Sequence, residues 1–352
     1  MSTYKAAAIR KFTSHVDDYQ IIDVERKSPE KTQVEVQVYA ASVNPVDYKR
    51  ARGMLSLIVP DTFPLRLGYD VAGIVTNVGC NVTKFKAGDR VYGCVNHDEI
   101  GTIAEYVVSD EIYLAVLPNN IEFTVGASVP LAGLTAKQAM DIGGAEGKET
   151  IFVSGGMGGV GMFGVALARH YFKARSVITT VSTSKIEYAK KMGATQVVDY
   201  TKEDYTEVLE NAADVTFDTV GDKELYKIAK PNTIVVSVAL APDGNLLHKL
   251  RASSMPFTWI EWSKLVIART ATNVFKWIST RQFRAKGVKY AYLFTERNGQ
   301  ELEKTFNPLL ESKIVEPVIA EVYEFTNEGV RSAFKKAMDG HVAGKLIIRV
   351  RD

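Results

Sequence analysis

Residues 151–161 read IFVSGGMGGVG, and the residues after them, 162–173, have helical character. Within this stretch Gly156, Gly158 and Gly161 follow the spacing G-x-G-x-x-G between an apolar run and a helix. Side chains at the first two positions would obstruct the turn and the approach of a pyrophosphate, and the third glycine lets the helix lie close to the strand. The pattern predicts a dinucleotide phosphate loop made by Gly156, Gly158, Gly159, Val160 and Gly161. The alternative is a tight turn that binds nothing.

Further apolar runs follow the loop at regular intervals. They occupy residues 177–181, 196–198, 215–217 and 234–238, and a typical helical stretch, 185–192, lies between two of them. Strands that alternate with helices predict a parallel, doubly wound sheet covered on both faces. The glycine loop therefore lies where a dinucleotide-binding fold requires it.

The residues after the second strand of this series bear on the choice between NAD and NADP. That strand runs into Ser182, Thr183 and Lys185, with no acidic residue at its end. An acid there would bind the ribose of NAD and repel a 2′-phosphate, whereas hydroxyl and ammonium groups can bind the phosphate. We therefore expect NADPH, with all three residues as contacts. Alternatively, Ser182 and Thr183 only cap the next helix and Lys185 is a solvated charge.

In the first part of the chain, apolar residues follow a different period. Residues 33–40 alternate apolar and polar side chains, residues 71–75 form another apolar run, and turn residues such as those at 86–89 separate such segments. This pattern predicts a mainly β module, and the apolar run at 345–350 is expected to rejoin it. The predicted domains are 1–125 with 300–352, and 126–299.

Composition restricts the partners. The chain has 352 residues, 43 basic against 41 acidic side chains, two cysteines and five scattered histidines. This balance gives no electrostatic case for nucleic acid, and no apolar run suggests a signal peptide or membrane span. The histidines and cysteines show no metal-ligand spacing, so no metal is expected. We expect a small-molecule partner, a homodimer and a cytoplasmic location, with a mitochondrial one as the alternative.

Several motifs occur in a familiar order along nearly the whole chain. They are residues 41–50, 67–73, 86–93, 130–136, 192–194 with 199–200, and 340–345. Together they resemble the quinone oxidoreductase branch of the medium-chain dehydrogenases and reductases, which includes alkenal and enone reductases. The resemblance implies a GroES-like catalytic domain, a Rossmann domain and NADPH as cofactor. Zinc-containing relatives carry a cysteine in the motif at 42–44, a histidine in the motif at 68–70 and a four-cysteine lobe, and this chain has none of these.

Without a metal, an enone needs a donor at its carbonyl oxygen, where negative charge grows during hydride transfer. Lys49 is the leading candidate because the resembled family places this stretch beside the nicotinamide, and Tyr48 is the alternative. An exposed lysine after a turn would carry no such role. Asn44 could orient the nicotinamide, or could start the turn at Asn44-Pro45.

The remaining cofactor contacts are implied by resemblance alone. They are Thr135 facing the nicotinamide, Tyr200 near the adenosine, and Asp218, Ser237, Leu293 and Phe294 at the nicotinamide end. Asp218 could equally be a capping residue, and Leu293 and Phe294 could be ordinary core residues that contact the cofactor only through their backbone.

Residues 244–289 exceed what a simple family member needs and contain all three tryptophans. We expect one or two extra helices packed on the cofactor domain; a substrate lid, a dimer surface or a membrane-surface contact are the alternatives. Three functions stay open from the sequence. The first is an NADPH-dependent reductase of quinones or α,β-unsaturated carbonyls, the second an enoyl-thioester reductase, and the third a weakly catalytic NADPH-binding regulatory protein.

Overall fold

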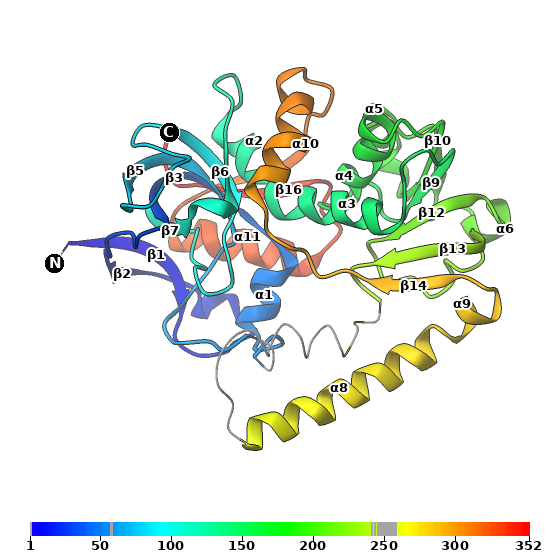
Figure 1. The fold of residues 1–352 in the computed structure, drawn as a ribbon, viewed down its shortest axis with the longest axis horizontal. Helices are drawn as coiled ribbons and strands as arrows, with labels where there is room; N and C mark the ends of the chain where they lie inside the picture. Colours follow the sequence, from blue (N-terminus) through cyan, green and yellow to red (C-terminus); the bar gives the residue numbers. More distant parts are fainter. Residues whose placement is uncertain (1, 57–58, 241, 243, 245–258) are drawn as a thin grey trace. The chain divides into compact units, whose positions relative to one another are not determined.

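A computed structural model describes residues 2–56, 59–240, 242, 244 and 259–352, with side chains of the long helix α8 described from Val266 onward. The chain forms two compact units (Figure 1). Unit 1 contains the described residues of 1–56, 60–134 and 296–352, and unit 2 contains those of 57–59 and 135–295. No described helix is long and apolar enough to cross a membrane.

Unit 2 is built on a six-stranded sheet in which every neighbouring pair is parallel. The strand order is β11-β10-β9-β12-β13-β14, so the order reverses between β9 and β12. This arrangement confirms the predicted doubly wound sheet, in which ligands bind outside the carboxyl ends of the strands at the reversal point. The bounds are β9 Thr150–Val153, β10 Ser176–Val181, β11 Gln196–Asp199, β12 Ala213–Asp218, β13 Ala229–Ser237 and β14 Lys289–Tyr292.

Helices connect these strands. The glycine loop leads from β9 into α4, and Gly164 on that helix lies so close to the sheet that an added Cβ would be 3.1 Å from Phe217 and Val153 side chains. Phe283, which is fully buried, anchors α9 against Tyr226 and Tyr290. The helices are α4 Gly161–Ala166 with a π-helical turn Leu167–Tyr171, α5 Ile186–Lys191 after a turn Thr183–Lys185, α6 Tyr205–Val208, α8 Trp259–Ser279 and α9 Arg281–Ala285. Helix α3, Pro130–Ile142, precedes β9 and begins in unit 1.

Unit 1 is mainly β. A seven-stranded sheet has the order β15-β16-β3-β5-β6-β8 with β7 paired to β3, and a smaller sheet has the order β2-β1-β4. The C-terminal strand β16 pairs antiparallel with β3, from Leu346 opposite Val43 to Arg349 opposite Ala40. The strands are β1 Thr3–Ile9, β2 Gln20–Glu25, β3 Gln33–Val43, β4 Leu65–Arg66, β5 Asp70–Val78, β6 Arg90–Cys94, β7 Tyr106–Asp110, β8 Leu114–Val116, β15 Ile319–Glu324 and β16 Lys345–Arg349.

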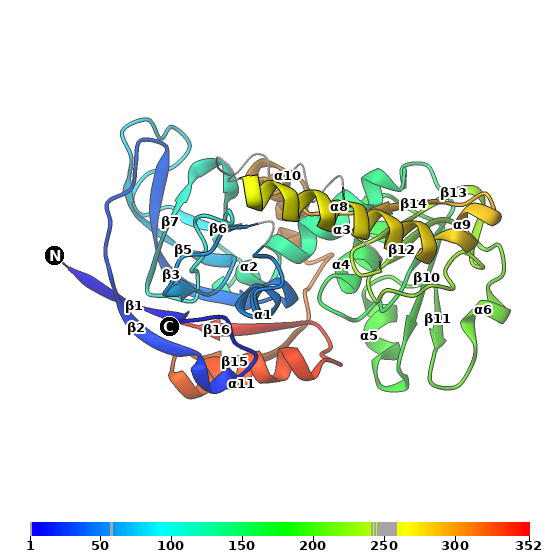
Figure 2. The ribbon, with the colours of Figure 1, turned by 90° about the horizontal axis from the view of Figure 1, so that it is seen from below.

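The helices of unit 1 pack on these sheets. Helix α11 contacts β15 and β16 (Figure 2), and its Phe334 packs edge-on against Tyr19 in the core. Helix α1 begins directly after β3 and carries two of the predicted catalytic residues. The helices are α1 Pro45–Ala51, α2 Phe123–Ser128, α10 Gly299–Glu311 and α11 Asn327–Asp339, with short turns at Val16–Asp18 and Glu111–Tyr113.

The alternation predicted for residues 33–40 holds on its apolar side, where Val34, Val36 and Val38 are fully buried. The polar side differs at Glu35, which is only 3% exposed. Arg26 donates two hydrogen bonds of 2.7 Å to its carboxylate, and Thr76 donates another. These bonds hold the pKa of Glu35 below its usual value although burial opposes this, and they explain why a charged residue tolerates a buried position.

Candidate functional site

The glycine loop combines two constrained positions with one open position. A Cβ on Gly156 would lie 2.0 Å from Thr179 Oγ1, and one on Gly161 would lie 2.2 Å from the Gly155 carbonyl oxygen. These glycines let the loop pass beside β10 and let α4 begin against the loop. At Gly158 the nearest atom to such a Cβ is 3.4 Å away. The fold therefore needs glycine at 156 and 161, whereas 158 is left with space beside its backbone.

The same loop presents backbone donors that the protein does not use. Gly155 and Gly156 N–H groups donate to Thr180, and the Gly158 N–H donates to the Gly155 carbonyl. In the described part of the chain, no acceptor faces the N–H groups of Gly159, Val160 and Gly161, and residues 158–160 are partly exposed. Consecutive free N–H groups at a helix start form an anion site.

The residues predicted to bind a 2′-phosphate do not all remain available. Thr183 donates its hydroxyl proton to Asp199, which also accepts two hydrogen bonds from Thr201, at 2.6 and 3.0 Å. These bonds lower the pKa of Asp199 to about 2. Because a hydroxyl has one proton, Thr183 cannot also donate it to a phosphate.

Ser182 and Lys185 lie half-buried at the same turn, and Tyr200 is exposed next to Asp199. Ser182 occupies the residue before the turn Thr183–Lys185 but makes no capping bond with its side chain. Burial lowers the pKa of Lys185. The turn thus brings one hydroxyl group and one amine group together, and the Tyr200 phenol follows Asp199.

The predicted nicotinamide-end residues of unit 2 are largely engaged with one another. Asp218 is fully buried and accepts hydrogen bonds from the Ser237 and Ser154 hydroxyl groups, at 2.7 and 3.2 Å, and from the Gly221 N–H at 2.8 Å. The Leu293 N–H donates to the Ser237 carbonyl. These bonds engage the Asp218 carboxylate within unit 2, and its contact with a cofactor stays a prediction.

Two hydroxyl groups lie together at a different point of unit 2. The Oγ1 atoms of Thr135 and Thr295 are 2.6 Å apart, and Thr135 is 5% exposed. The Leu293 side chain is buried and the Phe294 side chain is half-buried. A contact between their backbone groups and the cofactor stays a prediction.

In unit 1 a buried polar cluster surrounds Asp70. Its carboxylate accepts hydrogen bonds from the Ser42 hydroxyl at 2.7 Å and the Asn44 amide at 2.8 Å, and Lys345 Nζ lies 3.4 Å away. Lys345 also donates to Asn44 Oδ1, and all four residues are at most 3% exposed. Asn44 also starts α1, since its backbone N–H donates to Asp47. Among the described residues, none accepts a hydrogen bond from the second N–H of its side-chain amide.

Helix α1 holds Lys49 and Tyr48 on adjacent positions. Lys49 is exposed, none of the described residues accepts a hydrogen bond from its ammonium group, and partial desolvation lowers its pKa. Tyr48 is half-buried, its pKa is raised by burial, and the Arg52 guanidinium lies 5.3 Å from its ring centre. Asp47 is buried, which raises its pKa to about 7.

A second polar network in unit 1 was not foreseen from the sequence. The Tyr69 hydroxyl lies 2.7 Å from Arg50 Nη1 and 2.8 Å from His97 Nδ1, and Arg297 Nη2 lies 3.1 Å from His97 Nε2. Burial and the two arginines lower the pKa of His97 to about 2, so the ring is neutral. Since arginine can only donate, Nε2 accepts and Nδ1 donates to Tyr69. The charge of the buried Arg50 is neutralised by Asp61, whose Oδ1 lies 2.7 Å from Arg50 Nε.

Of the residues in this network, the sequence drew attention only to the motif that contains Tyr69. Tyr69 occupies the motif in which zinc-containing relatives carry histidine, but its partners are distant in sequence. Within the described residues, no group of three or more His, Cys, Asp or Glu side chains is arranged to hold a metal ion.

Known proteins share both units of this fold. Residues 30–119 match the alcohol dehydrogenase GroES-like domain, and residues 192–348 match the family described as zinc-binding dehydrogenase. The chain is 33% identical to a 2-methylene-furan-3-one reductase of Solanum lycopersicum over 90% of this chain and 71% of that protein. It is 32% identical to a chloroplastic NADPH-dependent alkenal/one oxidoreductase of Arabidopsis thaliana, over 90% of this chain and 72% of that protein.

Solved structures agree with these sequence matches. The quinone oxidoreductase of Coxiella burnetii superposes with a TM-score of 0.80 at 25% identity, over 99% of this chain and 100% of that one. The chain therefore belongs to the medium-chain dehydrogenase/reductase family, in its quinone oxidoreductase and enone reductase branch.

Proposed function

We propose that this chain is an NADPH-dependent reductase of conjugated carbonyl compounds, either α,β-unsaturated carbonyls or quinones, that works without a metal. The observation that carries the proposal is the phosphate loop, in which three free N–H groups stand beside the open position at Gly158. The two relatives named for reduction of a methylene-furanone and of alkenals support the acceptor class.

NADPH fits the groups at the turn after β10. Ser182 can donate a hydroxyl proton and Lys185 an ammonium proton to a 2′-phosphate, while Thr183 donates its own hydroxyl proton to Asp199. Asp199 carries a negative charge, but its carboxylate oxygens accept hydrogen bonds from Thr183 and Thr201. Its role is therefore to order the turn.

The cofactor, when bound, supplies the hydride. The protein must then polarise the acceptor, because reduction of a conjugated carbonyl builds negative charge on its oxygen. Lys49 suits this role: its ammonium group is exposed, and its lowered pKa makes it a better proton donor. Tyr48 is the alternative donor, and Asn44 offers its remaining amide N–H to the nicotinamide.

The test is NADPH oxidation, followed by absorbance, with a quinone, an alkenal and an enoyl thioester as separate acceptors after exhaustive chelation. We expect turnover with the quinone or the alkenal and none of the activity to depend on metal. Turnover with the thioester alone would favour the enoyl-thioester alternative. Tight NADPH binding without turnover of any acceptor would favour a regulatory protein. The homodimer and the cytoplasmic location stay predictions.

A further inference from the structure

Helix α8 turns its apolar side chains toward solvent. Ile267, Val274, Phe275, Trp277 and Ile278 are 69%, 53%, 50%, 65% and 54% exposed. At 100° per residue these five side chains fall on one side of the helix, which we call the α8 face. An ordinary surface helix has the opposite arrangement, and a contiguous exposed apolar face marks an interaction site.

The α8 face lies within a strongly basic segment. Residues 244–289 hold nine of the chain's 43 basic side chains and one of its 41 acidic ones, although the whole chain carries a net charge of only +2. No acidic residue occurs from 262 to 295. Positive charge is thus concentrated on the helix and on the residues that follow it.

Some of this charge borders the apolar side chains directly. The Arg284 guanidinium stacks over the Trp277 ring, 5.2 Å from its centre. Arg281 and Lys289 are exposed beyond the end of the helix. Lys276 lies on the side of α8 opposite the α8 face, whereas Arg269 lines a hollow together with Val274 and Trp277.

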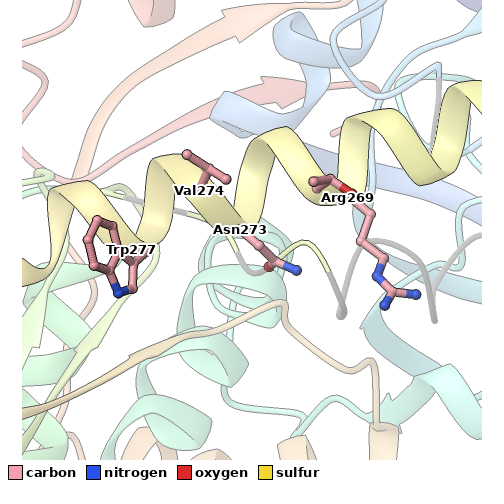
Figure 3. A pocket seen from close by; sticks show the side chains of 5 residues that line it. Arg269, Asn273, Val274 and Trp277 are labelled. Atoms are coloured by element: carbon pink, nitrogen blue, oxygen red, sulfur yellow. The ribbon is translucent and has the colours of Figure 1, made fainter.

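Other occupants fit the α8 face less well. In an isologous dimer each copy would bring the same positive segment to the contact, and like charges oppose such pairing. Among the described residues, the hollow along the helix (Figure 3) is lined by Arg269, Thr270, Asn273, Val274 and Trp277, which all belong to α8. Tryptophan and branched aliphatic side chains beside basic residues are instead the composition of helices that lie in a membrane interface.

We propose that the α8 face binds peripherally to membrane surfaces that contain anionic lipids. Apolar side chains enter the boundary between headgroups and acyl chains, and the neighbouring basic residues attract the lipid charge. The contact is peripheral because no described helix can span a bilayer. It is independent of the reaction that the chain catalyses.

Flotation of the full chain with vesicles tests the proposal. We expect binding to phosphatidylcholine–phosphatidylserine vesicles, weak binding to pure phosphatidylcholine, and loss of binding in high salt. The triple variant Ile267→Ser, Val274→Ser, Ile278→Ser should lower the vesicle partition coefficient at least about tenfold. The matched control replaces two exposed apolar residues elsewhere, Ile112→Ser and Val208→Ser, which are 61% and 54% exposed, and should bind as the original chain does.

Three outcomes would overturn the proposal. The first is absence of binding to any vesicle, and the second is equal binding by the triple variant. The third is that the original chain does not bind vesicles and is a dimer by light scattering, whereas the triple variant is a monomer. The α8 face would then be a contact between two copies. Thermal unfolding of each variant checks that the substitutions leave the fold intact.

Discussion

Replacement of Gly158 by alanine separates cofactor binding from folding. The new methyl group would lie 3.4 Å from its nearest neighbour, the Gly155 carbonyl oxygen, which is ordinary contact. Gly158 is also absent from the glycines with positive φ, so alanine meets no backbone strain there. The free energy of unfolding should therefore stay the same or rise by up to about 1 kcal/mol, since alanine restricts the unfolded chain.

Cofactor affinity should change much more. We expect the pyrophosphate to bind the free N–H groups of Gly159 and Val160, and a methyl group on the preceding residue would obstruct its approach. Loss of one hydrogen bond to a charged group costs about 1.5–3 kcal/mol, which corresponds to a Kd raised roughly ten- to hundredfold. Calorimetric titration with NADPH and thermal unfolding of the same samples measure both quantities.

Gly156→Ala provides the matched comparison. Its methyl group would lie 2.0 Å from Thr179 Oγ1 and 2.8 Å from Thr179 Cβ, so the strand or the loop must move. Such overpacking costs about 1–3 kcal/mol, and this variant should unfold at a lower temperature. An unchanged NADPH Kd in Gly158→Ala, or a stability loss there as large as that in Gly156→Ala, would refute our interpretation of the loop.

Three further predictions follow from the site. Lys49→Met should lower the rate of hydride transfer at saturating NADPH about a hundredfold in stopped-flow measurements; an unchanged rate beside a large loss in Tyr48→Phe would transfer the donor role to Tyr48. Lys185→Met should weaken NADPH binding but not NADH binding in calorimetry, whereas Thr183→Val should lower the melting temperature; the reverse pattern would contradict the assignment. Asp47 has a pKa raised from 3.8 to about 7 in the folded protein, so its contribution to stability should be lost as pH rises from about 4 to about 7. Asp47→Asn should remove that slope from the unfolding temperature, and an identical slope in both proteins would contradict the shift.

The sequence predicted those features that depend on local spacing. The glycine loop, the strands of the parallel sheet and the β character of the first module all follow from patterns a few residues long. The length of α8 also agrees with the expectation of extra helices in residues 244–289, of which 245–258 lie outside the described residues.

Contacts between distant segments could not be predicted in this way. Thr183 meets Asp199 because β10 and β11 pair in parallel, with Val181 opposite Asp199, and only that register brings the hydroxyl to the carboxylate. The network of Tyr69, His97 and Arg297 joins residues up to about 230 positions apart. The expectation of helices packed on the cofactor domain likewise did not indicate that apolar side chains of α8 face solvent.

Transfer of deuterium from NADPH labelled at the reactive C4 position to an enone tests the central claim most directly. Single-turnover reaction in the presence of a chelator, followed by mass spectrometry of the product, locates the label. We expect a saturated ketone with one deuterium on its β-carbon, because the proposed reductase adds hydride to the conjugated carbon while charge develops on the oxygen. Deuterium on the carbonyl carbon of an alcohol product, or transfer only after zinc is added, would contradict the account.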